Sequence, residues 1–203
     1  LEEASGEPLA EAEEVSGEDG AFAVYTSGST GNPKGILHSH ASLAAAVARH
    51  RAFFLPKESD VQLSCASFSF VAMMIDIYTP LSAGQSVHIL PEEKRKDVRR
   101  IEQYIRQHGI TMAFISPQML RNFRSPGPSL RLVVTGSERV SRVKGSGYRL
   151  LNTYGCSETA AVVTAFEIER EYENTPIGKA GEGVRILLLD KEGNEVPAGE
   201  EWE

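Results

Sequence analysis

The chain has 203 residues, of which 41% are hydrophobic and 24% charged, and its formal net charge is −7. This length and composition suit one ordinary globular domain and exclude a wholly unfolded chain. The longest apolar runs span about half a dozen residues, whereas a membrane-spanning helix needs about 20. No secretory leader opens the sequence and its two cysteines form no CxxC pair. We therefore expect a reduced, cytoplasmic protein without membrane partners, disulfides or structural zinc.

The negative charge is concentrated at the start of the chain. Residues 1–20 contain eight acidic residues and no lysine or arginine, which leaves 20 acids against 21 bases, a balance of +1, in the remainder. This stretch is rich in Gly, Ser and Glu and has no apolar period, so we predict an acidic, flexible lead-in over residues 1–20. The remainder has no basic footprint of the kind that binds nucleic acid, and we expect no nucleic-acid partner.

Beyond the lead-in, β-favouring runs alternate with helical patterns. In chain order we expect strands at 21–26 and 35–38, joined as a hairpin, a helix at 41–54, a strand at 61–65, a helix at 72–81, a strand at 86–90, a helix at 94–108, a strand at 110–115, a helix at 117–123, and strands at 130–135, 150–154 and 160–166. Strands separated by single helices favour an α/β fold with a mainly parallel sheet and helices on both faces. We assign residues 21–166 to this α/β subdomain.

The pattern changes after residue 166. Residues 184–190 and 195–196 predict a C-terminal β-hairpin with Gly193 and Asn194 at its turn. The sequence stops a few residues into what should be another strand, and an unpaired edge is a liability. We therefore expect residues 167–203 to be the truncated start of a β-rich subdomain.

The strongest chemical signal is the segment YTSGSTGNPKG at residues 25–35. Its glycines let backbone N–H groups converge on phosphate oxygens, its hydroxyls donate further hydrogen bonds, and Lys34 supplies positive charge. The usual ATPase loop is excluded, because Pro33 stands where that loop needs glycine and Gly35 follows the lysine in place of Ser or Thr. We favour a polyphosphate-binding loop over an ordinary surface turn.

This segment closely resembles the phosphate loop of the adenylate-forming enzymes, a family that includes nonribosomal peptide synthetase adenylation domains, acyl- and aryl-CoA ligases and luciferase. A second segment, NTYGCSET at residues 152–159, is similar to that family's NxYGxTE motif, with Ser157 where threonine is usual. The resemblance implies ATP and Mg²⁺ as cofactors, Lys34, Ser157 and Glu158 as catalytic residues, and Glu158 as the metal ligand. The cofactor-binding residues that it implies are Thr26, Ser27, Gly28, Ser29, Thr30, Gly31, Asn152, Tyr154 and Gly155.

A third segment, FSFVAMMIDIY at residues 68–78, resembles the acid-binding core of amino-acid-activating members, especially D-alanine–carrier-protein ligases. In those enzymes an aspartate pairs with the substrate's α-ammonium group, and Val71 stands in its place here. Since a buried ammonium needs a counter-charge, we expect an acyl, aryl, keto or hydroxy acid without a charged α-amine. Alignment by the flanking motifs implies a substrate pocket, for which ordinary core packing is the alternative, formed by Val71, Ala72, Ile75, Phe114, Val133, Thr135, Thr153, Ala161 and Val162.

The resemblance also implies what the parent enzyme does. It would be an ATP-dependent ligase that activates a carboxylic or amino acid as acyl-AMP and passes the acyl group to a carrier-protein phosphopantetheine or to CoA. The family's ribose-binding aspartate and mobile catalytic lysine have no counterpart in these residues, so we expect the fragment alone to be inactive. Two alternatives stay open, a non-catalytic binding module with a degenerate adenylation fold and a fragment of an acyl- or aryl-CoA ligase. His38 and His40 form an HxH pair, but no third metal ligand follows at a matching spacing.

Overall fold

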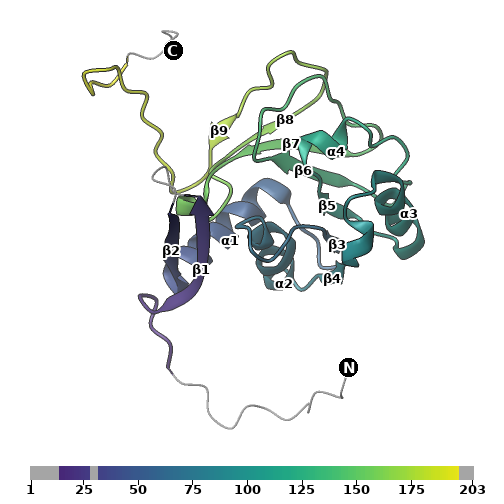
Figure 1. The fold of residues 1–203 in the computed structure, drawn as a ribbon, viewed down its shortest axis with the longest axis horizontal. Coiled ribbons are helices and arrows are strands. Elements are labelled where there is room, and N and C mark those ends of the chain that lie inside the picture. The colour runs from purple at the N-terminus through teal and green to yellow at the C-terminus, as the bar shows by residue number, and fades with distance from the viewer. Residues whose placement is uncertain (1–13, 28–31, 197–203) are drawn as a thin grey trace.

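The computed structural model describes residues 14–27 and 32–196 (Figure 1). Two antiparallel strands, β1 (Gly20–Ser27) and β2 (Pro33–Ser39), form a hairpin at the start of this part, with Thr26 opposite Lys34. The hairpin predicted around the glycine-rich loop is therefore confirmed, while residues 28–31 at its tip lie outside the described residues. It stands as a separate two-stranded ribbon beside the main sheet.

Among the described residues, seven strands form the main sheet in the order β4-β3-β5-β6-β7-β8-β9. Their bounds are Val61–Ser64 for β3, Ser86–Ile89 for β4, Met112–Phe114 for β5, Leu132–Gly136 for β6, Arg149–Tyr154 for β7, Thr164–Glu167 for β8 and Lys179–Ala180 for β9. Neighbouring strands from β4 to β7 are parallel, and β8 and β9 continue the sheet antiparallel. The predicted, mainly parallel sheet is confirmed. The carboxyl ends of β5, β6 and β7 share one edge, which is where open parallel sheets bind ligands.

In the part of the chain that the structure describes, four α-helices accompany the sheet: α1 (His40–Phe54), α2 (Thr79–Ser82), α3 (Val98–His108) and α4 (Pro117–Leu120). The longer two have clear start signals, because the Ser39 and Asp97 side chains accept hydrogen bonds from N–H groups of the first turns of α1 and α3. Gly109 ends α3 in the left-handed conformation that glycine adopts without strain.

Helices cover both faces of the sheet, as predicted. Successive strand side chains point to opposite sides, and in β6 Leu132 and Val134 pack in one core cluster with Phe54 of α1. Val133 packs in the other cluster, with Ile105 of α3. The sheet therefore separates two cores, and the face toward which a β6 side chain points decides which core it joins.

Three predicted helices are shorter or interrupted. Residues 72–81 contain a π-helical turn, Met74–Tyr78, before α2 begins. Residues 94–108 contain a break at Asp97, since this residue caps α3 after a 3₁₀ turn at Glu92–Lys94. The helix predicted at 117–123 ends at Leu120.

The strand prediction for 160–166 is wrong at its start. Ala160 and Ala161 have φ angles of +53° and +75°, which no strand allows, and β8 begins at Thr164. The C-terminal turn forms at Gly193, and within the described residues its two arms pair through one bridge between Leu189 and Glu195. This segment leaves the sheet after β9 (Figure 1).

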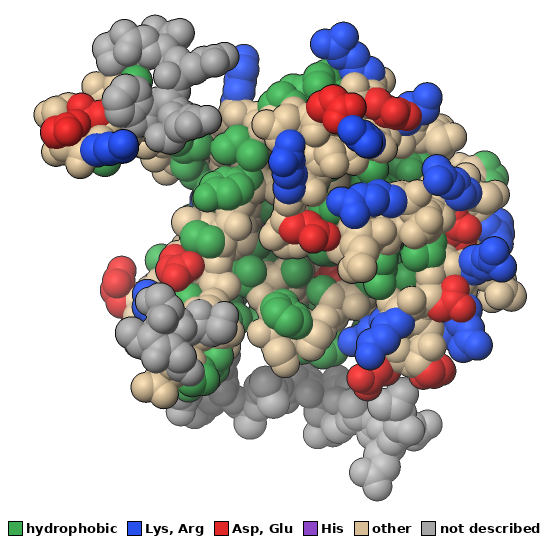
Figure 2. All heavy atoms as spheres, turned by 45° about the horizontal axis from the view of Figure 1, so that its top comes forward, with side chains coloured by type: hydrophobic (Ala, Val, Ile, Leu, Met, Phe, Trp, Pro, Cys, Tyr) green, Lys and Arg blue, Asp and Glu red, His purple; other side chains and the backbone are tan. Residues whose placement is uncertain are grey.

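None of the helices in the described ranges is long and apolar enough to cross a membrane. On the face seen in Figure 2, lysine and arginine side chains are interspersed with acidic ones and do not form one continuous stripe.

Candidate functional site

The two segments expected to bind nucleotide meet in space at the end of the hairpin. Lys34 lies at the start of β2, and Glu158 lies in a 3₁₀ turn, Ser157–Thr159, that follows β7. The Lys34 Nζ and Glu158 Oε1 atoms are 3.8 Å apart, and the two side chains are 65% and 51% exposed. An ion pair this exposed adds little stability. Its charges are therefore open to a bound charged group.

A buried histidine joins the hairpin to this turn. His38 is 4% exposed and stacks on Phe22, and its Nε2 lies 2.7 Å from the carbonyl oxygen of Ser157. Its Nδ1 lies 3.0 Å from the Ser42 hydroxyl. Because a carbonyl only accepts, Nε2 carries the proton and Nδ1 accepts from Ser42. From the sequence we considered His38 only as half of a metal pair, although the two-residue period of a strand places it on the same side of β2 as Lys34.

Local hydrogen bonds keep Glu158 ionised. A hydrogen bond from its own backbone N–H, and then one from the Cys156 side chain, lower the pKa of the Glu158 carboxyl below its ordinary value, and the positive charge of Lys34 lowers it further. No group of three or more metal-binding side chains forms within residues 14–27 and 32–196. A single carboxylate nevertheless fits Mg²⁺, which in nucleotide sites takes its other ligands from phosphate and water.

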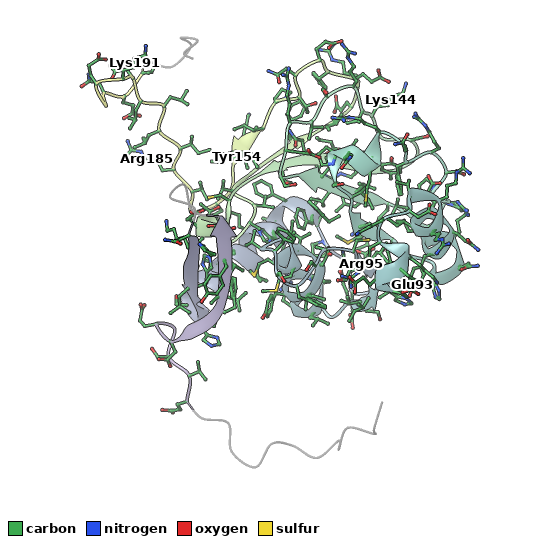
Figure 3. All side chains as sticks on the ribbon, viewed as in Figure 1. Glu93, Arg95, Lys144, Tyr154, Arg185 and Lys191 are labelled. Carbon is green, nitrogen blue, oxygen red and sulfur yellow. The ribbon has the colours of Figure 1, made fainter. Side chains whose placement is uncertain are left out.

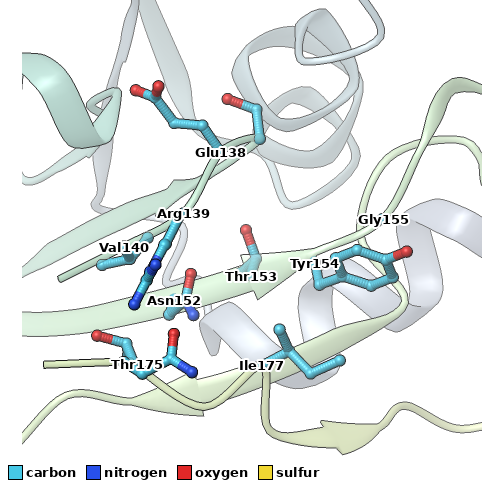
Figure 4. A pocket seen from close by; sticks show the side chains of 11 residues that line it. Glu138, Arg139, Val140, Asn152, Thr153, Tyr154, Gly155, Thr175 and Ile177 are labelled. Carbon is cyan, nitrogen blue, oxygen red and sulfur yellow. The ribbon is translucent and has the colours of Figure 1, made fainter. Parts of the chain in front are cut away.

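A cavity of about 340 Å³ opens along β7, just before this turn. Figure 4 shows Asn152, Thr153 and Tyr154 in a row along β7, between the segment of Glu138 and Arg139 on one side and Thr175 and Ile177 on the other. Figure 3 places Tyr154 at the end of β7 that faces the hairpin. The full lining is Ser137, Glu138, Arg139, Val140, Asn152, Thr153, Tyr154, Gly155, Asn174, Thr175 and Ile177. The structure thus brings the expected cofactor residues Asn152, Tyr154 and Gly155 together in this cavity.

Two parts of this lining were missed from the sequence. One directly follows β6, beginning with Ser137, and its position after a parallel strand was the available signal. The other precedes β9 and includes Thr175, which no local pattern marks. Thr175 is 8% exposed, and its hydroxyl has no hydrogen-bond partner among the described residues. A buried polar group without a partner is costly, so this hydroxyl suits a contact with a bound molecule.

A second, smaller cavity of about 60 Å³ adjoins the first. The two share Ser137, Thr153, Tyr154 and Gly155 in their linings. Seven of the nine residues expected in a substrate pocket line it, namely Val71, Ala72, Ile75, Phe114, Thr153, Ala161 and Val162. Residues from four separate segments therefore converge on one space.

Val133 and Thr135 do not line this cavity, which corrects that part of the expected pocket. Val133 is fully buried in the core on the α3 side of the sheet, whereas Ile75 and Val162 pack on the α1 side. Thr135 lies two residues further along β6 and so points to the same side as Val133. Side chains on this face of β6 point away from the cavity, because successive residues of a strand point to opposite faces.

At Gly155 the backbone lies directly against the carbonyl oxygen of Ala161. A Cβ atom there would lie 1.4 Å from the carbonyl oxygen of Ala161. Ala161 in turn holds a left-handed backbone conformation, which costs a residue with a side chain about 1–2 kcal/mol. Strain of this kind persists only where surrounding contacts hold it.

The remaining expected residues belong to the phosphate loop. Thr26 lies in β1 and pairs with Lys34 across the hairpin. Ser27 ends β1, and Gly28, Ser29, Thr30 and Gly31 lie outside the described residues, so their expected roles stay predictions.

The chain matches the profile of a protein family described as AMP-binding enzyme over residues 1–203. It is 35% identical over 182 residues to bacitracin synthase 1 of Bacillus licheniformis, which covers 89% of this chain and 4% of that protein. It is 30% identical over 209 residues to the D-alanine–D-alanyl carrier protein ligase of Lactiplantibacillus plantarum, which covers 93% of this chain and 41% of that protein.

Solved structures agree with the sequence relatives. The N-terminal subdomain of Klebsiella oxytoca NpsA, in complex with 3-hydroxybenzoyl-AMSN, is similar to this chain with a TM-score of 0.79 and 25% identity. The similarity covers 95% of this chain and 50% of that one. The chain thus spans about half of this solved relative and a much smaller share of the synthetases.

Proposed function

Because the chain belongs to the AMP-binding enzyme family, we propose that it forms the nucleotide- and acid-binding part of an adenylate-forming ligase. A carboxylate oxygen of the acid attacks the α-phosphorus of ATP, pyrophosphate leaves, and an acyl-adenylate forms. A thiol then takes the acyl group, and AMP is released. Since the chain covers only part of each relative, the complete activity is proposed for an enzyme that includes this chain.

The meeting of Lys34 and Glu158 is the observation that carries this proposal. The two side chains come from distant segments, their atoms lie 3.8 Å apart, and both remain more than half exposed. Such a pair contributes little to stability but offers a cation and a carboxylate beside the cavity along β7. A triphosphate with its metal ion needs this combination of charges.

Each nucleotide group has a candidate partner in this arrangement. Lys34, with the N–H and hydroxyl groups of residues 26–31, would hold the β- and γ-phosphates, and the Ser157 hydroxyl would bond the α-phosphate. Tyr154 is 54% exposed and offers a free ring face for adenine. Glu158 would hold Mg²⁺, which when bound offsets the charge that develops on the phosphates.

The smaller cavity supports an acid without a charged α-amine. Its lining consists of apolar side chains with Ser137, Thr153 and Tyr154, and no acidic residue belongs to it in the described part of the chain. Asp76 does not supply the missing charge, because it is fully buried and its Oδ2 accepts hydrogen bonds of 2.9 Å from the N–H groups of Cys65 and Ala66. A buried ammonium group would therefore find no counter-charge here. We propose a small acyl, aryl, keto or hydroxy acid.

The acceptor thiol belongs to a carrier-protein phosphopantetheine or to CoA in this proposal. The similarity to a D-alanyl carrier protein ligase supports the carrier protein. A cytoplasmic location, where ATP and reduced thiols are present, is part of the same proposal.

Acid-dependent exchange of labelled pyrophosphate into ATP by the full-length enzyme tests the function. We expect Lys34→Ala and Glu158→Gln to lower the exchange rate at least about 100-fold and to leave the free energy of unfolding close to that of the parent. Lys144→Ala is the matched control, because Lys144 is also 65% exposed and lies 4.0 Å from the exposed Glu171. This variant should exchange at the parent rate.

The remaining outcomes separate the alternatives. Exchange driven best by D-alanine would overturn the proposed acid class. Tight binding of MgATP without exchange for any acid would favour a non-catalytic module. Equal exchange rates in the parent and the Lys34→Ala variant would overturn the assigned phosphate site.

A further inference from the structure

His50 lies behind the smaller cavity without lining it. This residue sits in the interior of α1 and is 0% exposed. Its Nε2 accepts a 3.2 Å hydrogen bond from the N–H of Val162, which forms part of the cavity wall. Its Nδ1 lies 3.0 Å from the Thr79 hydroxyl, and this hydroxyl donates a 2.9 Å hydrogen bond to the carbonyl oxygen of Met74.

These bonds have one consistent direction. A backbone N–H can only donate, so Nε2 is the acceptor nitrogen and the proton of the neutral ring is on Nδ1. Nδ1–H therefore donates to the Thr79 oxygen, and the Thr79 hydroxyl proton is free for Met74. The chain Val162–His50–Thr79–Met74 is thus a continuous series of satisfied hydrogen bonds inside the protein.

Both ends of this series are irregular backbone that forms the cavity. Met74 begins the π-helical turn that carries Ile75, and Val162 follows the left-handed Ala161. Ile75, Ala161 and Val162 line the cavity. Single π turns and strained backbone occur often at functional sites, and each needs outside contacts to keep its shape.

The residue before His50 holds the same loop from its other side. The Arg49 Nε donates a 2.8 Å hydrogen bond to the carbonyl oxygen of Val162, and its Nη2 donates a 3.2 Å bond to that of Thr159. Consecutive residues of α1 thus bind both backbone groups of Val162. Of these two residues, His50 also connects the loop to the π-helical turn, through the hydroxyl of Thr79.

We propose that His50 is a positioning residue that sets the spacing of the two walls of the acid pocket, and through it the size of acid that the enzyme accepts. This inference rests on the proposed function for its substrate, but the link between the walls is a property of the chain itself. The cavity is only about 60 Å³, so a small movement of either wall changes which acyl group fits. One methylene group in a pocket already changes kcat/KM about 10- to 200-fold.

Two amide variants separate the halves of the link in the full-length enzyme. In His50→Gln the side-chain amide reaches the Nε2 position and retains an acceptor for Val162. In His50→Asn it reaches only the Nδ1 position, which retains a donor for Thr79 and leaves the Val162 N–H without a partner. We expect His50→Asn to raise KM for the preferred acid about tenfold and to reduce selectivity against its next higher homologue by a similar factor.

Other kinetic constants distinguish positioning from a general loss of folding. KM for MgATP should stay within about twofold of the parent in both variants, and His50→Gln should restore KM for the acid to within about threefold. Thr79→Val should change the acid constants in the same direction as His50→Asn, and the double variant should be less than additive. Variants that only lower the amount of active enzyme, with parental KM and selectivity, would overturn the proposal.

Hydrogen exchange tests the link without any activity. Thr79→Val should speed exchange of backbone amides in residues 160–163, because the hydrogen bonds of His50 to Thr79 and to Val162 connect them. Thr135→Val is the matched control, since Thr135 is equally buried, has no hydrogen-bond partner for its hydroxyl among the described residues, and lies on the other face of the sheet. It should leave residues 160–163 unchanged.

Pyrophosphate exchange and backbone hydrogen exchange test the proposed function and the His50 link separately. If the parent enzyme shows no acid-dependent exchange of pyrophosphate, the proposed function fails while hydrogen exchange still decides the link. If Thr79→Val alters only residues 74–79, the link itself is overturned whatever the activity of the parent.

Discussion

At the scale of single residues, the site depends on a few positions where the backbone or the charge allows one residue type. Gly155 is the clearest, because the carbonyl of Ala161 occupies the place of its missing side chain. Lys34 and Glu158 are different, since their exposed pair does little for folding. Substitutions at these positions therefore separate structural from functional roles.

We predict that Gly155→Ala destabilises the protein and abolishes MgATP binding. A new Cβ would meet backbone that cannot move without changing the loop, so we expect a loss of about 3 kcal/mol or more in the free energy of unfolding. Urea unfolding and nucleotide titration measure the two effects. In Gly17→Ala the new Cβ would make an ordinary 3.5 Å contact with Ala41, and this control should stay within about 0.5 kcal/mol of the parent. Parental stability of Gly155→Ala would contradict the backbone geometry.

The two cysteines should react differently with iodoacetamide. Burial, and then the charge of Asp76, raise the pKa of the Cys65 thiol, so little reactive thiolate forms there. Cys156 is exposed and directly precedes Ser157 and Glu158. We expect mass spectrometry to find modification at Cys156 only, slowed by MgATP and not by Mg²⁺ alone. Equal labelling rates with and without MgATP would contradict a nucleotide at this turn.

At the scale of elements, the hairpin β1–β2 is not part of the main sheet, yet it carries Lys34 to Glu158. His38 connects the hairpin to the turn that carries Glu158, since it stacks on Phe22 of β1 and hydrogen-bonds to the Ser157 carbonyl. The ribbon position, and with it the charge of the glycine-rich loop, therefore depends on a side chain outside both recognised motifs.

We predict that His38→Ala raises KM for MgATP about tenfold, because the loss of one buried hydrogen bond to Ser157 frees the ribbon from the turn. His38→Gln retains an N–H donor at the position of Nε2 and should stay within about threefold of the parent. Pyrophosphate-exchange kinetics at varied MgATP provide the comparison. If both variants raise KM for MgATP by the same factor, packing of the ring, and not the hydrogen bond, keeps the hairpin in contact with the turn.

At the scale of the whole molecule, folding shifts two buried titratable groups in opposite directions. Burial, with a further contribution from the positive charge of Arg49, lowers the pKa of His50 from 6.5 to about 3. Burial raises the pKa of Asp76 from 3.8 to about 7, although hydrogen bonds from the N–H groups of Ala66 and Cys65 oppose this rise. Both groups are therefore held neutral in the folded protein over a range in which the unfolded chain ionises them.

The signs of the two contributions to stability are opposite. Stability rises with pH wherever the unfolded chain binds more protons than the folded chain. Between about pH 4 and 6.5 His50 is protonated in the unfolded chain and neutral in the folded chain, so this group makes stability rise with pH. In the same window the folded chain retains a proton on Asp76 that the unfolded chain releases, so this group makes stability fall with pH. The two contributions offset each other in the parent.

We predict that substituting either His50 or Asp76 leaves the pH dependence of stability that the other residue contributes. Relative to the parent, the free energy of unfolding of His50→Gln should fall with rising pH by up to about 1.4 kcal/mol per unit, and that of Asp76→Asn should rise by a similar amount. Urea unfolding at about pH 4.5, 5.5 and 6.5 measures these slopes. The comparison uses slopes, because both substitutions also lower stability at every pH. Slopes parallel to that of the parent would contradict the pKa shifts.

The local order of the chain predicted much of this molecule. Alternating apolar patterns predicted the mainly parallel sheet with helices on both faces, and the hairpin followed from a glycine-rich loop between two β-favouring runs. The segments that hold Lys34 and Glu158 were recognisable because the residue types that bind phosphate and metal are few and closely spaced. These features depend on neighbours within about ten residues, which the amino-acid order displays directly.

Only the tertiary structure decided the features that depend on contacts between distant segments. Val133 and Thr135 were assigned to the wrong face of β6, since a strand pattern buried on both sides does not reveal its register. Neither the left-handed backbone at Ala161 nor the roles of His38 and His50 follow from local pattern, because these features depend on contacts with segments far away in the chain. The amino-acid order by itself predicted the segments of the candidate site and the elements that carry them. Folding decided which side chains share a cavity, because that depends on the packing of segments far apart in the chain.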